Sequence, residues 1–206
     1  MRRHVLFWLV LLALCSLALP AVIPAPEALA RIQREITQLQ ALFGEEHAGL
    51  LVNRANAAFD HIVAGSGLLD GMRRLHVSEA RSHALPGNAI SNLSAATNRY
   101  LASAATQLYG AFVRLFIMLA WLPYVLLFLA AAVVHGLVRR RIKLDSFGLI
   151  SPVAYAASSH AIIGLTFLPL LYLIAPLQLP PLFVPIWTLA AGAPVIGLLA
   201  NIQRLR

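Results

Sequence analysis

The chain has 206 residues, of which 60% are hydrophobic and only 12% are charged, and its formal net charge is +8. A soluble domain usually carries about 25% charged residues, so this composition disfavours a soluble enzyme and indicates an integral membrane protein. The single cysteine, Cys15, excludes both an intrachain disulfide and a cysteine-cluster metal site.

The positive charge is unevenly distributed. Residues 24–111 contain seven Arg and seven acidic residues, so this segment is neutral. Outside it lie nine Lys or Arg and one acid, Asp145, and 9 − 1 = +8 accounts for the whole net charge. Because these cations lie at the ends of apolar runs, they indicate membrane topology and disfavour a basic face that binds nucleic acid.

Residues 1–23 predict the first membrane helix. Two arginines precede an uncharged run from Val5 to Leu19, and Pro20 follows. This pattern is typical of a signal peptide or of an uncleaved signal anchor. We expect an anchor. Cleavage at the motif formed by residues 28–30 and lipoprotein processing at Cys15 are the alternatives.

Residues 24–111 predict a periplasmic helical domain. Apolar positions recur at helical spacing in two stretches, first at Leu29, Ile32, Ile36, Leu39 and Phe43, and again at Ile90, Leu93, Thr97, Tyr100 and Ala104. A weaker amphipathic helix covers 48–63, and a loop covers 83–88. We expect 28–43 and 90–108 to pack as an antiparallel pair in a hairpin or small bundle, with Glu35 among the polar residues outside the seam.

Residues 112–206 predict a three-span transmembrane domain, with spans at 112–135, 151–175 and 182–200. Because no strong helix breaker precedes the second span, we expect one helix from Ala89 to His135. Arg114, near the outer end of this span, can extend to the water. The predicted fold class is therefore all-α, a polytopic membrane protein with four transmembrane helices.

The cations Arg139, Arg140, Arg141 and Lys143 fall in a predicted loop, 139–148. The positive-inside rule places this loop and both termini in the cytoplasm. The cluster has two compatible interpretations, a topology signal that contacts anionic lipid and a docking patch for an acidic partner.

The third span contains a polar cluster, Ser158, Ser159 and His160. Polar residues at membrane depth are functional candidates. The favoured interpretation is structural, with Ser hydroxyls bonded to carbonyls of their own helix and His160 bonded to a neighbouring span. No predicted span contains a carboxylate, which disfavours a Ser-His-acid hydrolase.

Other candidate sites are weaker. A metal site could form from Glu45, Glu46, His47 and His61, but solvated helix faces are favoured. No Gly-rich phosphate loop followed by Lys occurs. The sequence therefore predicts no enzyme, no catalytic residue, no metal and no cofactor.

From the second span onward the chain resembles a family of inner-membrane proteins of integrating conjugative elements and some conjugative plasmids, a conserved domain of unknown function. The residues that carry the resemblance are Leu122-Pro123, His135 through Arg140 leading into Ile142, and His160 after Tyr155. The resemblance implies a bacterial inner-membrane accessory of conjugative DNA transfer that works with type IV secretion components. It implies a coupling ATPase as the natural partner.

Two functions are therefore considered. The leading hypothesis is a non-catalytic membrane component of a conjugation assembly that contacts lipid, docks partners and is able to self-associate, without binding nucleic acid directly. The alternative is a small homo-oligomeric transporter or channel with a polar path along the third span.

Overall fold

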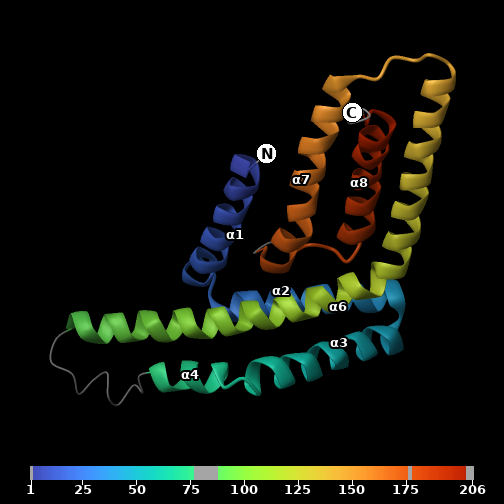
Figure 1. Ribbon diagram of the computed structural model, residues 1–206. Coiled ribbons are helices and arrows are strands. Elements are labelled where there is room, and N and C mark those ends of the chain that lie inside the picture. Colours follow the sequence, from blue (N-terminus) through green and yellow to red (C-terminus); the bar gives the residue numbers. More distant parts are fainter. Residues whose placement is uncertain (1, 77–87, 176–177, 203–206) are drawn as a thin grey trace. The chain divides into compact units, whose positions relative to one another are not determined.

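The computed structural model describes residues 2–76, 88–175 and 178–202, and within these ranges its regular structure is entirely helical (Figure 1). This confirms the all-α prediction. In chain order the helices are α1 (Arg2–Val22), α2 (Ala25–Phe43), α3 (Glu45–Phe59), the π-helical turn η1 (Asp60–Ala64), α4 (Leu68–Leu75), α6 (Asn88–Asp145), α7 (Pro152–Ile174) and α8 (Phe183–Ala200).

Four of these helices, α1, α6, α7 and α8, are long and apolar enough to cross a membrane. The four predicted spans are confirmed at that level. The continuity of the second span with the preceding helix is confirmed as well, since α6 is a single helix of 58 residues. At roughly 1.5 Å per residue it is about 87 Å long, so only part of α6 can lie in a hydrocarbon core about 30 Å thick.

The chain divides into two compact units. The bundle unit comprises Leu12–Ile117 and Tyr172–Pro181, and the span unit comprises Met1–Leu11, Met118–Leu171 and Leu182–Arg206. Three helices, α1, α6 and α7, contribute residues to both units. The assignment of the predicted domains to compartments stays a prediction.

In the bundle unit, α2 and α3 form an antiparallel hairpin. Gly44 joins them with φ of +82°, a left-handed conformation that glycine adopts without strain. The start of α6 runs parallel to α2, because Ser103 donates a hydrogen bond to the Ile23 carbonyl and Gly110 lies against Ile32. The predicted antiparallel pairing of 28–43 with 90–108 is therefore wrong, since α3 and α4 carry the chain back before α6 begins.

The buried stripes of this bundle differ in part from the predicted seams. Ile32 and Leu39 are buried as expected, but Leu29 and Leu93 are exposed. On α6 the buried positions include Ser103, whose small side chain lets the α6 backbone approach the chain near Ile23. A seam inferred from hydrophobicity alone misses such contacts, because close packing between helices often favours small residues.

In the span unit, one close contact at a glycine and two contacts made by tryptophans join the helices. A Cβ added at Gly136 of α6 would lie 2.8 Å from the Leu199 Cβ of α8, so the two helices meet closely there. The indole Nε1 of Trp187 in α8 donates to the Leu165 carbonyl of α7 at 2.7 Å. Trp8 of α1 stacks on Phe167 of α7 at 5.9 Å between ring centroids. These close contacts allow extended van der Waals packing, which is what holds helices together where lipid replaces water.

Candidate functional site

The predicted basic cluster lies on a helix and not in a loop. Arg139, Arg140, Arg141 and Lys143 occupy the last turns of α6, which continues to Asp145. This corrects the predicted loop 139–148, whose described non-helical part begins at Ser146. The helix continues because this basic stretch contains no glycine or proline and arginine and lysine are good helix formers.

The four cations have different surroundings. Arg139 and Arg141 are exposed, and Arg141 has only a long contact with Asp145, at 3.8 Å. Lys143, by contrast, donates through Nζ to the Asn201 Oδ1 at 2.8 Å. The same oxygen accepts the Ser151 backbone N–H at 3.2 Å, so Asn201 connects the end of α6 to the start of α7.

The predicted polar cluster is used mainly in helix packing. Ser159 is buried and its hydroxyl donates to the Tyr155 carbonyl at 2.8 Å, which agrees with the structural interpretation. Ser158 lies against α8, because a Cβ added at Gly197 would be 2.5 Å from the Ser158 Oγ. His160 is exposed and its ring lies 5.3 Å from that of His4 on α1. The cluster is thus divided among contacts to two other helices.

A buried ion pair in the bundle unit was missed by the sequence analysis. Arg114 of α6 and Glu35 of α2 are 5% and 1% exposed, although Arg114 was expected to reach water and Glu35 to lie outside the seam. The Arg114 Nε donates to the Glu35 Oε2 at 2.9 Å, and its Nη2 donates to the Oε1 at 2.6 Å. Such a two-point contact matches the planar guanidinium to the carboxylate and fixes both side chains.

Arg114 also binds the end of α7. Its Nη1 donates to the Tyr172 carbonyl at 2.9 Å and to the Ala175 carbonyl at 2.6 Å. Its guanidinium carbon lies 5.5 Å from the centre of the Tyr172 ring. Carbonyls at the C-terminus of a helix lack partners in the helix and carry partial negative charge, so a cation stabilises them. Arg114 therefore joins α2, α6 and the end of α7.

A signal for this pair was present in the sequence. An arginine inside an apolar run needs a counter-charge if it is not to face lipid. Glu35 falls three residues after Ile32 and four before Leu39, in register with the buried stripe of α2. An acid in such a register and one arginine in an apolar span each indicate a buried charge, and the structure shows that the two charges meet.

A family model described as IncC plasmid conjugative DNA transfer protein DtrJ-like matches residues 19–202. The chain belongs to the DtrJ-like family. This confirms the resemblance to conjugative-transfer accessory proteins, and membership implies a role in conjugative DNA transfer. No curated protein and no solved structure gives a significant match.

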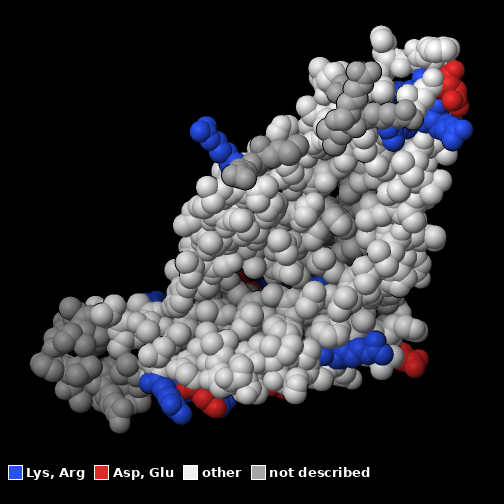
Figure 2. All heavy atoms as spheres, in the orientation of Figure 1, with Lys and Arg blue, Asp and Glu red and all other residues white. Residues whose placement is uncertain are grey.

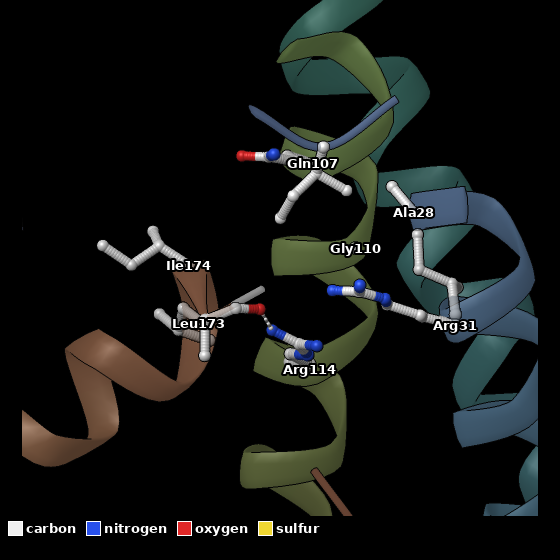
Figure 3. A pocket seen from close by; sticks show the side chains of 10 residues that line it. Ala28, Arg31, Gln107, Gly110, Arg114, Leu173 and Ile174 are labelled. Atoms are coloured by element: carbon white, nitrogen blue, oxygen red, sulfur yellow. Dashed lines mark hydrogen bonds between the residues drawn. The ribbon is translucent and has the colours of Figure 1, made fainter. Parts of the chain in front are cut away.

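In this DtrJ-like chain a cavity of about 30 Å³ lies beside Arg114. Figure 3 shows Arg114 reaching from α6 toward the end of α7, with Ala28 and Arg31 on the α2 side. The side-chain nitrogen of Gln107, which lines the same cavity, is buried with no hydrogen-bond partner among the described residues. A cavity of this size holds a water molecule but is about tenfold smaller than a typical ligand site.

The geometry of the ion pair suits a structural joint in this DtrJ-like chain. The guanidinium and the carboxylate neutralise each other, and each makes further hydrogen bonds to backbone groups, since the Leu179 N–H also donates to Glu35 at 3.4 Å. Within the described residues, no group of three or more His, Cys, Asp or Glu side chains is arranged to hold a metal ion.

Proposed function

We propose that this DtrJ-like chain is a non-catalytic inner-membrane component of a conjugative DNA-transfer assembly. Its bundle helices would dock partner proteins in the periplasm, and the basic end of α6 would lie in the cytoplasm with both termini. The observation that carries the proposal is the family match, which covers the bundle helices and three of the candidate spans together.

The joint at Arg114 supports a docking role. A docking surface keeps its shape best when its helices are fixed to one another, because ordering them on binding would cost affinity. The pair Arg114–Glu35 fixes α2 against α6 and against the end of α7.

Exposed apolar residues on the other helices of the bundle unit supply candidate contacts. Leu50 of α3, Ile62 of η1 and Leu75 of α4 are between 51% and 64% exposed. Single exposed apolar residues are common on protein surfaces and do not by themselves mark a binding site. These three are candidates because family membership leads us to expect a partner. The resemblance makes the coupling ATPase of the transfer channel the natural partner, and self-association is a second use of the same residues.

The decisive experiment compares two variants in donor cells. The first replaces Leu50, Ile62 and Leu75 by Glu, and the second is His160→Ala. We expect the triple variant to lower DNA-transfer frequency and co-purification of transfer proteins by about tenfold or more, since each ~1.4 kcal/mol lost in docking is a factor of ten. His160→Ala should leave both close to normal.

The reverse result would favour the alternative, a small transporter or channel with its path along Ser158, Ser159 and His160. Both variants change exposed side chains, so the amount of folded protein in the membrane serves as the control. If the triple variant accumulates normally and transfers DNA normally, docking through these residues is wrong.

The proposed orientation has its own test. After Cys15→Ser, single cysteines at Glu45 and Arg141 report their compartments through a thiol reagent that does not cross membranes. We expect Glu45→Cys to react in cells with a permeable outer membrane, and Arg141→Cys to react only after the inner membrane is opened. Reaction of both in the same compartment would overturn the orientation.

A further inference from the structure

The connection between α6 and α7 carries the two most exposed large apolar side chains in the described part of the chain. Phe147 is 95% exposed and Leu149 is 92% exposed. Even Val153, at the start of α7, is less exposed at 78%. Two nearby side chains of this kind would be unfavourable in water, so their surroundings in the cell require an explanation.

The backbone holds Phe147 in this exposed position. Its φ is +52°, a left-handed conformation that is normally taken by glycine after a helix and is strained for a bulky residue. The Gly148 N–H donates to the Lys143 carbonyl at 2.7 Å, and the Ser146 N–H donates to the Ile142 carbonyl at 2.9 Å. These bonds complete a regular helix end, so the exposed phenyl ring belongs to a defined turn.

Cations adjoin these two residues along the chain. Residues 139–149 contain four Lys or Arg and one acid, so their net charge is 4 − 1 = +3. The side chain of Arg141 is 84% exposed, and Arg139 is exposed as well. Figure 2 shows Lys and Arg atoms gathered where α6 ends, whereas the sides of the spanning helices are almost free of charge.

The connection is also short. It joins two candidate membrane spans, and only residues 146–151 lie between the end of α6 and the start of α7. A residue adds at most about 3.6 Å to an extended chain, so Phe147 lies within roughly 18 Å of Pro152. The headgroup region is roughly 5–8 Å thick on each side of the hydrocarbon core. A connection this short therefore keeps Phe147 and Leu149 close to the membrane surface if α6 and α7 both span.

We propose that residues 139–149 form a site for anionic phospholipid, which we call the headgroup clamp. Phe147 and Leu149 lie at the boundary between headgroups and acyl chains, while Arg139 and Arg141 bind the phosphates. The pattern of apolar side chains beside exposed cations is that of interfacial membrane segments. A leaflet fits better than an acidic protein because both spanning helices already hold this connection beside lipid. The proposal depends on α6 and α7 crossing the membrane and not on the transfer role.

The test uses the full chain with Cys15→Ser, reconstituted in nanodiscs of phosphatidylcholine with or without phosphatidylglycerol. Single cysteines at Phe147, Leu149 or Asp145 carry the same environment-sensitive fluorophore. Labels at 147 and 149 should be quenched by lipids with a nitroxide near the headgroup and should be several-fold less accessible to aqueous iodide than the label at Asp145, which is 72% exposed.

Two further comparisons complete the experiment. Adding Phe147→Ser to labelled Leu149→Cys should raise iodide access at position 149 above that of Leu149→Cys alone. This increase would show that the phenyl ring, and not the fluorophore, anchors the turn. Nitroxide quenching should increase with phosphatidylglycerol, and this increase should disappear in Arg139→Gln/Arg141→Gln.

Three outcomes would overturn the headgroup clamp. The first is iodide access at 147 and 149 equal to that at 145. The second is protection that appears only when a soluble cell extract is added, which would assign the turn to a protein. The third is a phosphatidylglycerol effect that persists without Arg139 and Arg141. Loss of DNA transfer is not a readout here, so failure of the clamp and failure of the assembly role remain distinguishable.

Discussion

Two arginines of α6 have opposite environments although both lie on one helix and both have an acidic neighbour. Arg114 in the bundle unit is 5% exposed and makes two short bonds to Glu35, which is 79 residues earlier in the chain. Arg141 in the span unit is 84% exposed as a side chain, and its neighbour Asp145, one turn away, lies at 3.8 Å. The comparison shows that the same residue types serve as a structural joint in one unit and as a surface charge in the other.

The physical reason is solvation. An exposed ion pair gains little, because water screens the attraction and two long side chains must be ordered. A buried ion pair stabilises the fold little more than an apolar pair of similar size would. Loss of one partner, however, leaves a charge that is buried without solvation, which costs stability. The importance of each arginine for folding should therefore follow its burial, and the following variants test that rule from the largest expected effect to the smallest.

Removal of one buried partner should have the largest effect. Arg114→Leu should lower the free energy of unfolding by about 3–5 kcal/mol, because it leaves the Glu35 carboxylate buried without its partner. The measurement is reversible unfolding in mixed micelles of dodecyl maltoside and increasing dodecyl sulfate. Adding Glu35→Leu to this variant should recover part of the lost stability. If the double variant loses as much free energy of unfolding as the two single variants added together, the interpretation is wrong.

Arg31→Ala is the matched control for that experiment. Arg31 also lies in the bundle unit and pairs with Glu27 one turn earlier, but the Glu27 side chain is 52% exposed. Its loss should change the free energy of unfolding by no more than about 0.5 kcal/mol.

Arg114→Lys tests whether charge alone is sufficient in the buried pair. Lysine keeps the positive charge but is a point donor that cannot reproduce the fork contacting Glu35 and the α7 carbonyls. We expect a loss of about 1.5–3 kcal/mol, the usual range for hydrogen bonds to charged groups, in the same micelle unfolding assay. A stability equal to that of the parent chain would show that the two-point geometry is unimportant.

Lys143 is an intermediate case within the span unit. It is partly buried and donates to Asn201 at 2.8 Å. Lys143→Met should cost about 1 kcal/mol, because Asn201 keeps its bonds to Ser151 and Gly197. Asn201→Ala removes all three bonds and should lower the free energy of unfolding by more than Lys143→Met does. Thermal unfolding of both purified variants in detergent checks this order.

The exposed arginine should matter least for stability. Arg141→Gln should change the free energy of unfolding by less than about 0.5 kcal/mol in any detergent. Its effect should appear instead in the chain reconstituted in nanodiscs, as a smaller rise in nitroxide quenching at labelled Leu149→Cys when phosphatidylglycerol is added. A large loss of stability would show that Arg141 has a structural role that its exposure does not indicate.

Much of the fold could be predicted because membrane helices are encoded locally. Runs of apolar residues long enough to cross a bilayer identified α1, α7 and α8 to within one or two residues. The absence of a strong breaker identified α6 as one helix from the bundle into the second span. The sequence predicts an end of α6 at His135, ten residues before its actual end at Asp145. Hydropathy locates where a span leaves the lipid and not where the helix stops.

The candidate site could be predicted only in part. The Ser159 hydroxyl donates to the Tyr155 carbonyl, a contact within one helix turn that the structural interpretation expected, and the role of the cluster stays a prediction. Glu35 was assigned to the solvent side, because a hydrophobic seam counts apolar residues and cannot show which acid is neutralised by an arginine 79 residues later. The parallel direction of α2 and α6 was missed for a similar reason, since spacing along a helix carries no information about its partner.

The sequence by itself determined that the chain is all-helical, that four of its helices can cross a membrane and that its net charge lies outside the neutral segment 24–111. These properties depend on neighbouring residues, for which hydrophobicity and helix propensity are sufficient. Only the tertiary structure decided that Arg114 and Glu35 are buried together and that Phe147 is held in the open. The ion pair joins residues 79 positions apart, and burial changes the free energy of both charges without changing their local sequence. The exposure of Phe147 depends on the conformation of the turn after α6, which hydrophobicity does not indicate.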